Sequence, residues 1–141
     1  MLRITVLCLG RLKEKHYIAA CEEYVKRLGG YCQPEIVELP ENGDIAARIP
    51  KGAFVVALCI EGDKLDSPGL ARLLDRCALE GHSRVCFLIG GSEGLPEDVK
   101  RSAQVRLSMS DMTFPHHLAR VMLLEQIYRA FTILAGAKYH K

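Results

Sequence analysis

The 141-residue chain lacks a strong charge of either sign, with 19 Lys and Arg against 17 Asp and Glu. This balance excludes a histone-like polycation but leaves room for a local basic site. No two of the six cysteines lie within four residues of each other, so CxxC and zinc-finger spacings are absent. Three cysteines fall in apolar runs typical of strands. We therefore expect reduced, buried thiols and a cytoplasmic location.

Membrane and nucleotide-binding motifs are also missing. The apolar opening 1–10 has no small-residue cleavage site and runs into Arg11 and Lys13, so it predicts a strand rather than a signal peptide. The apolar segment 117–135 contains two arginines and a glutamate, which argues against a membrane span. Neither G-x-G-x-x-G nor G-x-x-x-x-G-K-[ST] occurs, so dinucleotide and nucleoside triphosphate binding are poorly supported.

Apolar runs typical of buried strands alternate with segments of helical periodicity along the whole chain. Ser67 is the expected N-cap of one helix, with Pro68 at its first position and Gly81 closing it. The alternation predicts an α/β fold in one domain, residues 1–141, with a mostly parallel sheet flanked by helices on both sides. The expected strands are 2–9, 35–39, 53–60, 85–89 and 105–108, and the expected helices are 15–28, 45–48, 68–80, 96–103 and 116–135.

The final helix, 116–135, is apolar nearly all the way round rather than along one stripe. A small domain covers only one side of its terminal helix, whereas a second subunit covers the other. We therefore expect a homodimer, since isologous pairs are the commonest assembly. The alternative is a monomer in which this helix is buried between the sheet and another helix.

Two loops could accept a ligand. The glycine-rich segment 90–94 follows an apolar strand, and in open parallel sheets ligands bind at the carboxyl ends of strands. A tight turn without a ligand explains the glycines equally well. The segment 107–117 combines small polar residues with two methionines, a composition that suits an adenosine or thioether ligand. Methionines at a helix entry can equally belong to the core.

Basic and titratable residues gather in the C-terminal part. Residues 81–141 hold 8 Lys and Arg against 5 Asp and Glu, together with four of the five histidines, so this half is favoured for an anionic partner. The adjacent His116 and His117 do not share a helix face, and no metal site is predicted. The tail 138–141 has a composition used to contact nucleic acid, although chain termini are often idle.

Taken together, the motifs resemble the RlmH family, the ribosomal RNA large-subunit pseudouridine N3-methyltransferases of the SPOUT superfamily. The resemblance covers the whole chain. It differs from many members in the short segment 40–52, where they carry a longer helical stretch. Its most specific pieces are residues 4–12, LCIEG at 58–62, LIGGSEGL at 88–95, residues 107–117 with Arg120, EQIYRA at 125–130 and the terminal Tyr139-His140.

This resemblance implies a trefoil knot in the C-terminal part, a homodimer, and S-adenosyl-L-methionine as cofactor in the knot. It also implies ribosomal RNA as the partner, with no DNA and no membrane. The family's cofactor positions correspond here to Leu58, Gly90, Met109, Ser110, Asp111, Met112, Thr113 and Phe114.

The implied reaction is methylation of N3 of a pseudouridine in 23S ribosomal RNA, on assembled ribosomes. Loss of the N3 proton needs a base or a group that stabilises the developing charge. His140, with Tyr139, is the candidate for the proton, and Arg120 and Arg129 are candidates for phosphate or carbonyl contacts. The alternatives are a SPOUT methyltransferase acting on tRNA and a non-catalytic dimer that binds an adenosine ligand.

Overall fold

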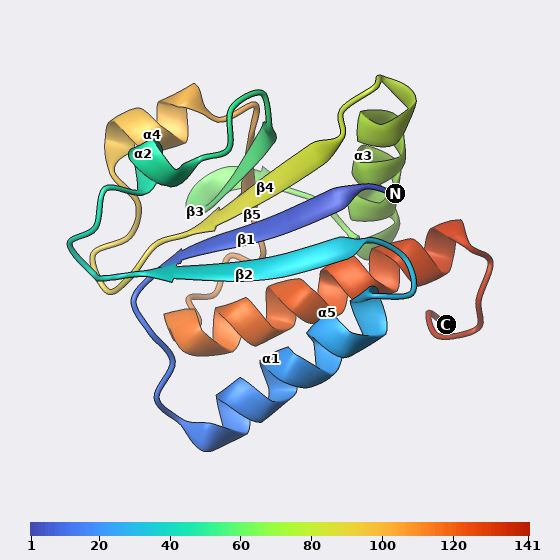
Figure 1. Cartoon of the computed structure of the whole chain (residues 1–141), viewed down its shortest axis with the longest axis horizontal. Helices are drawn as coiled ribbons and strands as arrows, with labels where there is room; N and C mark the ends of the chain where they lie inside the picture. Colours follow the sequence, from blue (N-terminus) through green and yellow to red (C-terminus); the bar gives the residue numbers. More distant parts are fainter.

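The computed structural model describes residues 1–141 (Figure 1). Five strands and five helices alternate along the chain, as the sequence predicts. The strands are β1 (Arg3–Leu9), β2 (Gln33–Leu39), β3 (Phe54–Lys64), β4 (Arg84–Ile89) and β5 (Val105–Ser108), and the helices are α1 (Lys15–Leu28), α2 (Ile45–Arg48), α3 (Ser67–Leu79), α4 (Glu97–Ser102) and α5 (His116–Leu134).

The strands form one sheet in the order β2-β1-β4-β3-β5, and every pair is parallel. Helices α1, α3 and α5 share a hydrophobic core with one face of the sheet, built around Val6, Phe87 and Ile127. Helices α2 and α4 cover the other face over a smaller core. The expected single-domain, helix-flanked parallel sheet is confirmed. The trefoil knot stays a prediction.

Two local expectations were wrong. Asp66, not Ser67, caps α3, since its carboxylate accepts a hydrogen bond from the Gly69 amide at 2.7 Å. Both residue types are good N-caps, and the chain uses the first of the two. Strand β3 also continues through polar residues to Lys64, because the 61–64 end pairs again with β5 after an irregularity between Leu58 and Asp63.

All six cysteines are free, and all but Cys59 are buried. Burial raises the pKa of the Cys8 thiol to about 12, so this group stays protonated and unreactive at neutral pH. None of the five helices has the length and hydropathy needed to cross a membrane.

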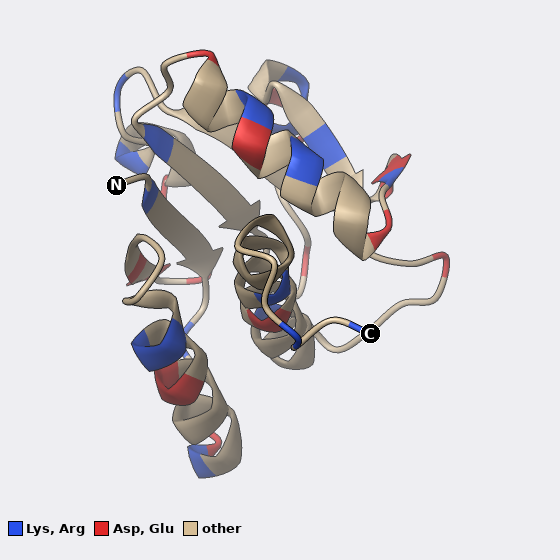
Figure 2. Cartoon of the chain, turned by 90° about the vertical axis from the view of Figure 1, so that its right-hand side faces the viewer, with Lys and Arg blue, Asp and Glu red and all other residues tan.

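Helix α5 packs against the sheet between α1 and α3, as Figure 2 shows with α5 nearly end-on. Its buried side faces the core, whereas Val121, Met122 and Tyr128 on other sides remain half-exposed. Val121 and Met122 line a hollow of about 490 Å³ together with Leu65 of the β3–α3 loop. The packing of this single chain therefore leaves part of the apolar circumference of α5 uncovered.

Candidate functional site

A pocket of about 260 Å³ opens where the carboxyl ends of β3, β4 and β5 meet. Ligands bind at this edge in open parallel sheets. Ten of its eighteen lining residues are hydrophobic, which suits a small organic ligand. Asp111 does not line the pocket and instead forms an exposed ion pair with Lys64 at 2.7 Å. The other predicted cofactor residues all line it: Leu58, Gly90, Met109, Ser110, Met112, Thr113 and Phe114.

Gly90 stands where the chain leaves β4 and doubles back on itself. A Cβ placed there would lie 2.4 Å from the carbonyl carbon of Gly94 and 2.6 Å from the amide nitrogen of Leu95. Real Cβ atoms do not approach backbone so closely, so any side chain at this position would force the turn open. The glycine is therefore required by the turn that forms one wall of the pocket.

One ion pair borders the pocket. Lys100 Nζ, on α4, lies 2.6 Å from Glu61 Oε1 on β3 and 3.3 Å from Glu97 Oε2. The hydrogen bond from Lys100 holds the pKa of Glu61 below its ordinary value, so the carboxylate is charged at neutral pH. Glu61 is the only carboxylate among the lining residues. Neither Glu61 nor Lys100 was predicted from the sequence as a site residue.

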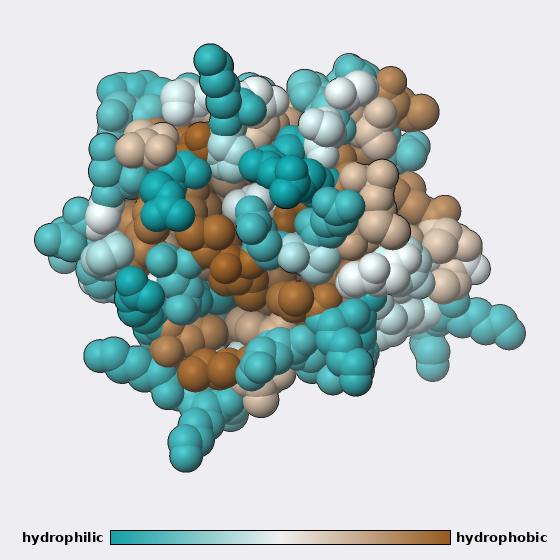
Figure 3. All heavy atoms as spheres, viewed as in Figure 1, coloured by the Kyte–Doolittle hydropathy of each residue, from teal (hydrophilic) through white to brown (hydrophobic).

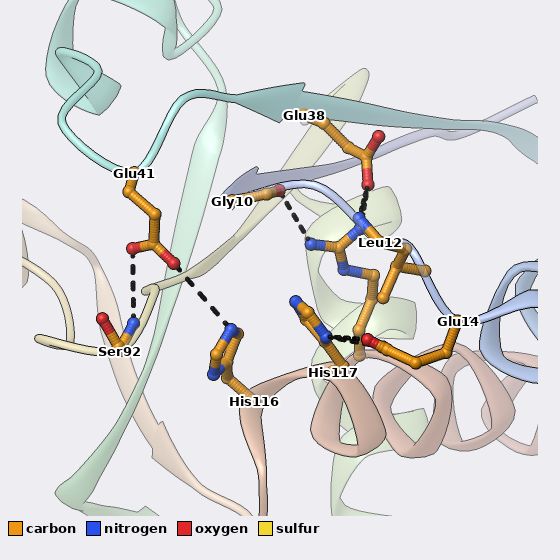
Figure 4. A network of polar contacts seen from close by, with 9 residues as sticks. Gly10, Leu12, Glu14, Glu38, Glu41, Ser92, His116 and His117 are labelled. Atoms are coloured by element: carbon orange, nitrogen blue, oxygen red, sulfur yellow. Dashed lines mark hydrogen bonds and ion pairs between the residues drawn. The ribbon is translucent and has the colours of Figure 1, made fainter.

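At the start of α5, two histidines meet carboxylates from distant loops (Figure 4). Glu41 accepts a hydrogen bond from the Ser92 amide at 3.4 Å, and its other oxygen lies 4.0 Å from His116 Nε2. His117 Nδ1 lies 3.1 Å from a Glu14 oxygen. Burial, together with the neighbouring His117, lowers the pKa of His116, which is therefore neutral at pH 7. His116 lines the pocket, so this network borders its mouth.

Arg120 lies apart from the pocket lining, in a network of its own. Its side chain is 1% exposed, and its guanidinium donates to the Glu38 carboxylate and, at 3.1 Å, to the Gly10 carbonyl. Glu38 also accepts a hydrogen bond from the Leu12 amide at 2.9 Å. Arg120 therefore holds the β1–α1 loop against β2 and α5, and its role at the substrate stays a prediction.

Glu38→Gln should lower the free energy of unfolding by about 3 kcal/mol, because it leaves the Arg120 charge buried without its counter-charge. The exposed Glu22→Gln is the matched control and should change that free energy by less than about 0.5 kcal/mol. Chemical denaturation of the two variants measures both values. Equal effects would show that the buried pair contributes no net stability.

The tail is anchored rather than frayed. Tyr139 donates a hydrogen bond to Glu125 Oε2 at 2.6 Å, and its ring packs edge-on against Tyr128 with centroids 4.8 Å apart. Burial would raise the pKa of Glu125, but hydrogen bonds from Arg129 and Tyr139 bring it below its ordinary value. His140 Nδ1 lies 3.1 Å from Arg129 Nη1. One cluster thus contains three of the site residues that the sequence predicted: Arg129, Tyr139 and His140.

The tail cluster lies further along α5 than the pocket. His116 and Ala119, which line the pocket, belong to the first turn, whereas the tail folds back onto Glu125 and Arg129 in the middle of the helix. At about 1.5 Å per residue, these two residues lie about 9 and 15 Å beyond Ala119 along the helix. No residue of the tail lines the pocket of its own chain. No three His, Cys, Asp or Glu side chains gather in a way that could hold a metal ion.

Comparison with known proteins agrees with this geometry. A family model described as "Predicted SPOUT methyltransferase" matches residues 2–140. A Clostridium botulinum protein named ribosomal RNA large subunit methyltransferase H is 42% identical over 159 aligned positions, covering 99% of this chain and all of the relative. The chain belongs to the RlmH family of SPOUT methyltransferases. A Clostridium novyi protein of the same name is 43% identical with the same coverage.

Solved structures show that the RlmH-family fold extends beyond close relatives. A probable methyltransferase from Bordetella pertussis superposes with a TM-score of 0.62 at 12% identity, covering 92% of this chain and 95% of the other. A tRNA (m1G37) methyltransferase from Aquifex aeolicus gives a TM-score of 0.55 at 18% identity, covering 99% of this chain and 73% of the other. At such low identity the likeness concerns the fold alone. Family membership makes the chain a methyltransferase, which requires a methyl donor.

Proposed function

We propose that this chain transfers a methyl group from S-adenosylmethionine to N3 of a pseudouridine in large-subunit ribosomal RNA, on assembled ribosomes. The proposal rests on the pocket at the strand ends of a chain that is 42% identical over its whole length to a ribosomal RNA large subunit methyltransferase H. The alternative, left open by the sequence, is a SPOUT methyltransferase acting on tRNA.

The pocket residues fit the proposed cofactor. The loop 109–114 combines backbone amides and small hydroxyls with methionine side chains, a lining that suits an adenosine and a thioether. Glu61, kept charged by Lys100, can accept hydrogen bonds from hydroxyl or ammonium groups. S-adenosylmethionine, when bound, supplies an activated methyl group. The chain's own task is then to orient the acceptor base and remove its proton.

His140 is the proposed acceptor of the N3 proton. Arg129 Nη1 lies 3.1 Å from His140 Nδ1, and this contact orients the imidazole. Tyr139, held by Glu125, fixes the position of the tail. Because no tail residue lines the pocket of its own chain, we propose that the tail serves the pocket of a second copy.

Antiparallel pairing of α5 from two copies meets this requirement. Such a pair places the tail of one chain beside the first turn of α5 in the other. It also covers the half-exposed Val121, Met122 and Tyr128. One interface would then complete the fold and the active site together.

Light scattering at micromolar concentration should give twice the chain mass of 15.7 kDa. A specific interface of this kind buries about 1,200–2,000 Å². Met122→Glu, which puts a charge on the uncovered side of α5, should shift the mass toward one chain. Lys51→Glu, at an exposed site in the α2–β3 turn, is the control and should leave the mass unchanged. A wild-type mass of one chain would contradict the composite site.

The function itself is tested by methyl transfer from labelled S-adenosylmethionine to intact ribosomes, to extracted ribosomal RNA and to tRNA. The proposal expects label in the large-subunit RNA of ribosomes. Label in tRNA alone would favour the alternative.

A further inference from the structure

The segment that joins β1 to α1 presents three cations without counter-charges. Arg11, Lys13 and Lys15 are all exposed, and none of them forms an ion pair. Figure 3 shows hydrophilic side chains projecting from this corner of the molecule, at the lower left. The nearest acids are engaged elsewhere: Glu14 pairs with His117, and Glu38 with Arg120. The segment therefore carries three exposed positive charges that form no ion pair within the chain.

The backbone of this segment is fixed. Leu12 donates to Glu38 at 2.9 Å, the Gly10 carbonyl accepts from Arg120 at 3.1 Å, and the Gly10 amide donates to the Leu39 carbonyl at 2.7 Å. A pinned backbone presents its side chains in one place and so lowers the entropy lost on binding. The buried Arg120 network thus acts as the support of the cationic loop.

The cationic loop also lies beside the mouth of the pocket. His117 contacts Glu14, which belongs to the segment between β1 and α1. The preceding residue, His116, lines the pocket. Figure 4 shows the rings of both histidines side by side at the start of α5. An RNA strand that delivers a base to the pocket must carry its flanking phosphates past this end of α5. Three cations held at that point suit RNA phosphates, because a phosphate contact depends on charge and not on the base sequence.

We propose that Arg11, Lys13 and Lys15 form the surface that docks the backbone of the substrate RNA, next to the base-accepting pocket. This inference rests on the proposed function for the identity of the RNA. The loop contacts phosphates and not the base, so it contributes to affinity and not to the chemical step. Arg120 and Glu38 hold the loop backbone in place through their hydrogen bonds to Gly10 and Leu12.

The test is binding of large ribosomal subunits at several salt concentrations by the triple variant Arg11→Gln, Lys13→Gln, Lys15→Gln. Each lost phosphate contact lowers the slope of log affinity against log salt by about 0.7–0.9, so the slope should fall by about 2–3. Binding at low salt should weaken about tenfold or more. S-adenosylmethionine affinity and thermal stability should not change, because the three side chains form no hydrogen bond or ion pair within the chain.

The matched control removes three other exposed, unpaired cations: Arg48→Gln, Lys51→Gln, Arg72→Gln. It alters the net charge equally and should leave the slope almost unchanged. If both triple variants lost the same amount of slope, the effect would come from net charge alone and the proposal would be wrong. An unchanged slope in the loop variant would also overturn the proposal.

Acetylation of the lysines is a second, independent experiment. Bound ribosomal subunits should protect Lys13 and Lys15 from acetylation but not Lys51. If Lys13 and Lys15 were acetylated equally with and without bound subunits, that result would also contradict the proposal.

The binding measurements do not depend on methyl transfer. A wild-type protein that binds subunits through this loop but methylates no ribosomal RNA would contradict the proposed function and retain the docking surface. A protein that methylates ribosomal RNA but binds subunits equally well without the three cations would contradict the docking surface and retain the proposed function.

Discussion

Ala119→Phe should abolish S-adenosylmethionine binding while the protein stays folded. Ala119 lines the pocket from the first turn of α5, so a larger side chain there extends into the 260 Å³ that the cofactor needs. We expect the affinity for S-adenosylmethionine to fall about 100-fold or more, where each tenfold loss corresponds to about 1.4 kcal/mol of binding free energy. Calorimetry on the folded variant gives the value. Ala78→Phe, on the exposed face of α3, is the control and should bind normally.

Gly90→Val should have the same effect for a different reason. Its Cβ would collide with the backbone of Gly94 and Leu95, so the turn that walls the pocket must move. Because that variant changes the turn as well as the cavity, Ala119→Phe decides the location of the cofactor. Normal affinity in folded Ala119→Phe would place the cofactor outside this pocket.

His140→Ala should reduce methyl transfer by about 10²–10⁴-fold, because a positioned acid or base contributes that much. Cofactor affinity should not change, since His140 does not line the pocket of its own chain. Deleting residues 138–141 should abolish transfer as well. The deletion also removes the Tyr139 hydrogen bond and ring contact, so it should cost some stability. Single-turnover methylation of ribosomes measures each loss, and the exposed Lys141→Ala is the control.

Mixing the two inactive proteins tests whether the site is shared between copies. A heterodimer of Ala119→Phe and His140→Ala would contain one intact pocket facing one intact tail. Subunit exchange between the variants should therefore restore methyl transfer. No recovery despite demonstrated exchange would place the tail and pocket of one chain in the same site. Full activity of His140→Ala alone would move the proton-accepting role to another residue, with His116 or His117 next in line.

The sequence predicted a parallel sheet and the approximate positions of its strands, but not the order of the strands. It also singled out the two loops that line the pocket, since parallel strands bring their carboxyl ends to one edge. It missed the polar end of β3, 61–64, because pairing with β5 rather than hydropathy places those residues in the sheet. It gave no sign of Asp66 as the cap, since Ser67 beside it is an equally good cap type.

Long-range polar pairs were beyond the reach of sequence patterns. Arg120 and Glu38 lie 82 positions apart, and no local spacing connects them. Arg120 was predicted to contact the substrate, and that role stays a prediction. Its buried ion pair with Glu38 could not be predicted from the sequence. The same holds for Lys100 and Glu61, which are 39 positions apart and border the pocket. The tail was expected to add little to the fold, but Tyr139 ties it back to α5.

Mapping the methyl group on ribosomal RNA is the decisive test of the proposed reaction. Wild-type protein, labelled S-adenosylmethionine and intact ribosomes should yield one labelled nucleotide in the large-subunit RNA, identified by mass spectrometry as a pseudouridine methylated at N3. The Ala119→Phe protein should yield none. Label on another base or on tRNA, or no label in any RNA despite measured cofactor binding, would contradict the account.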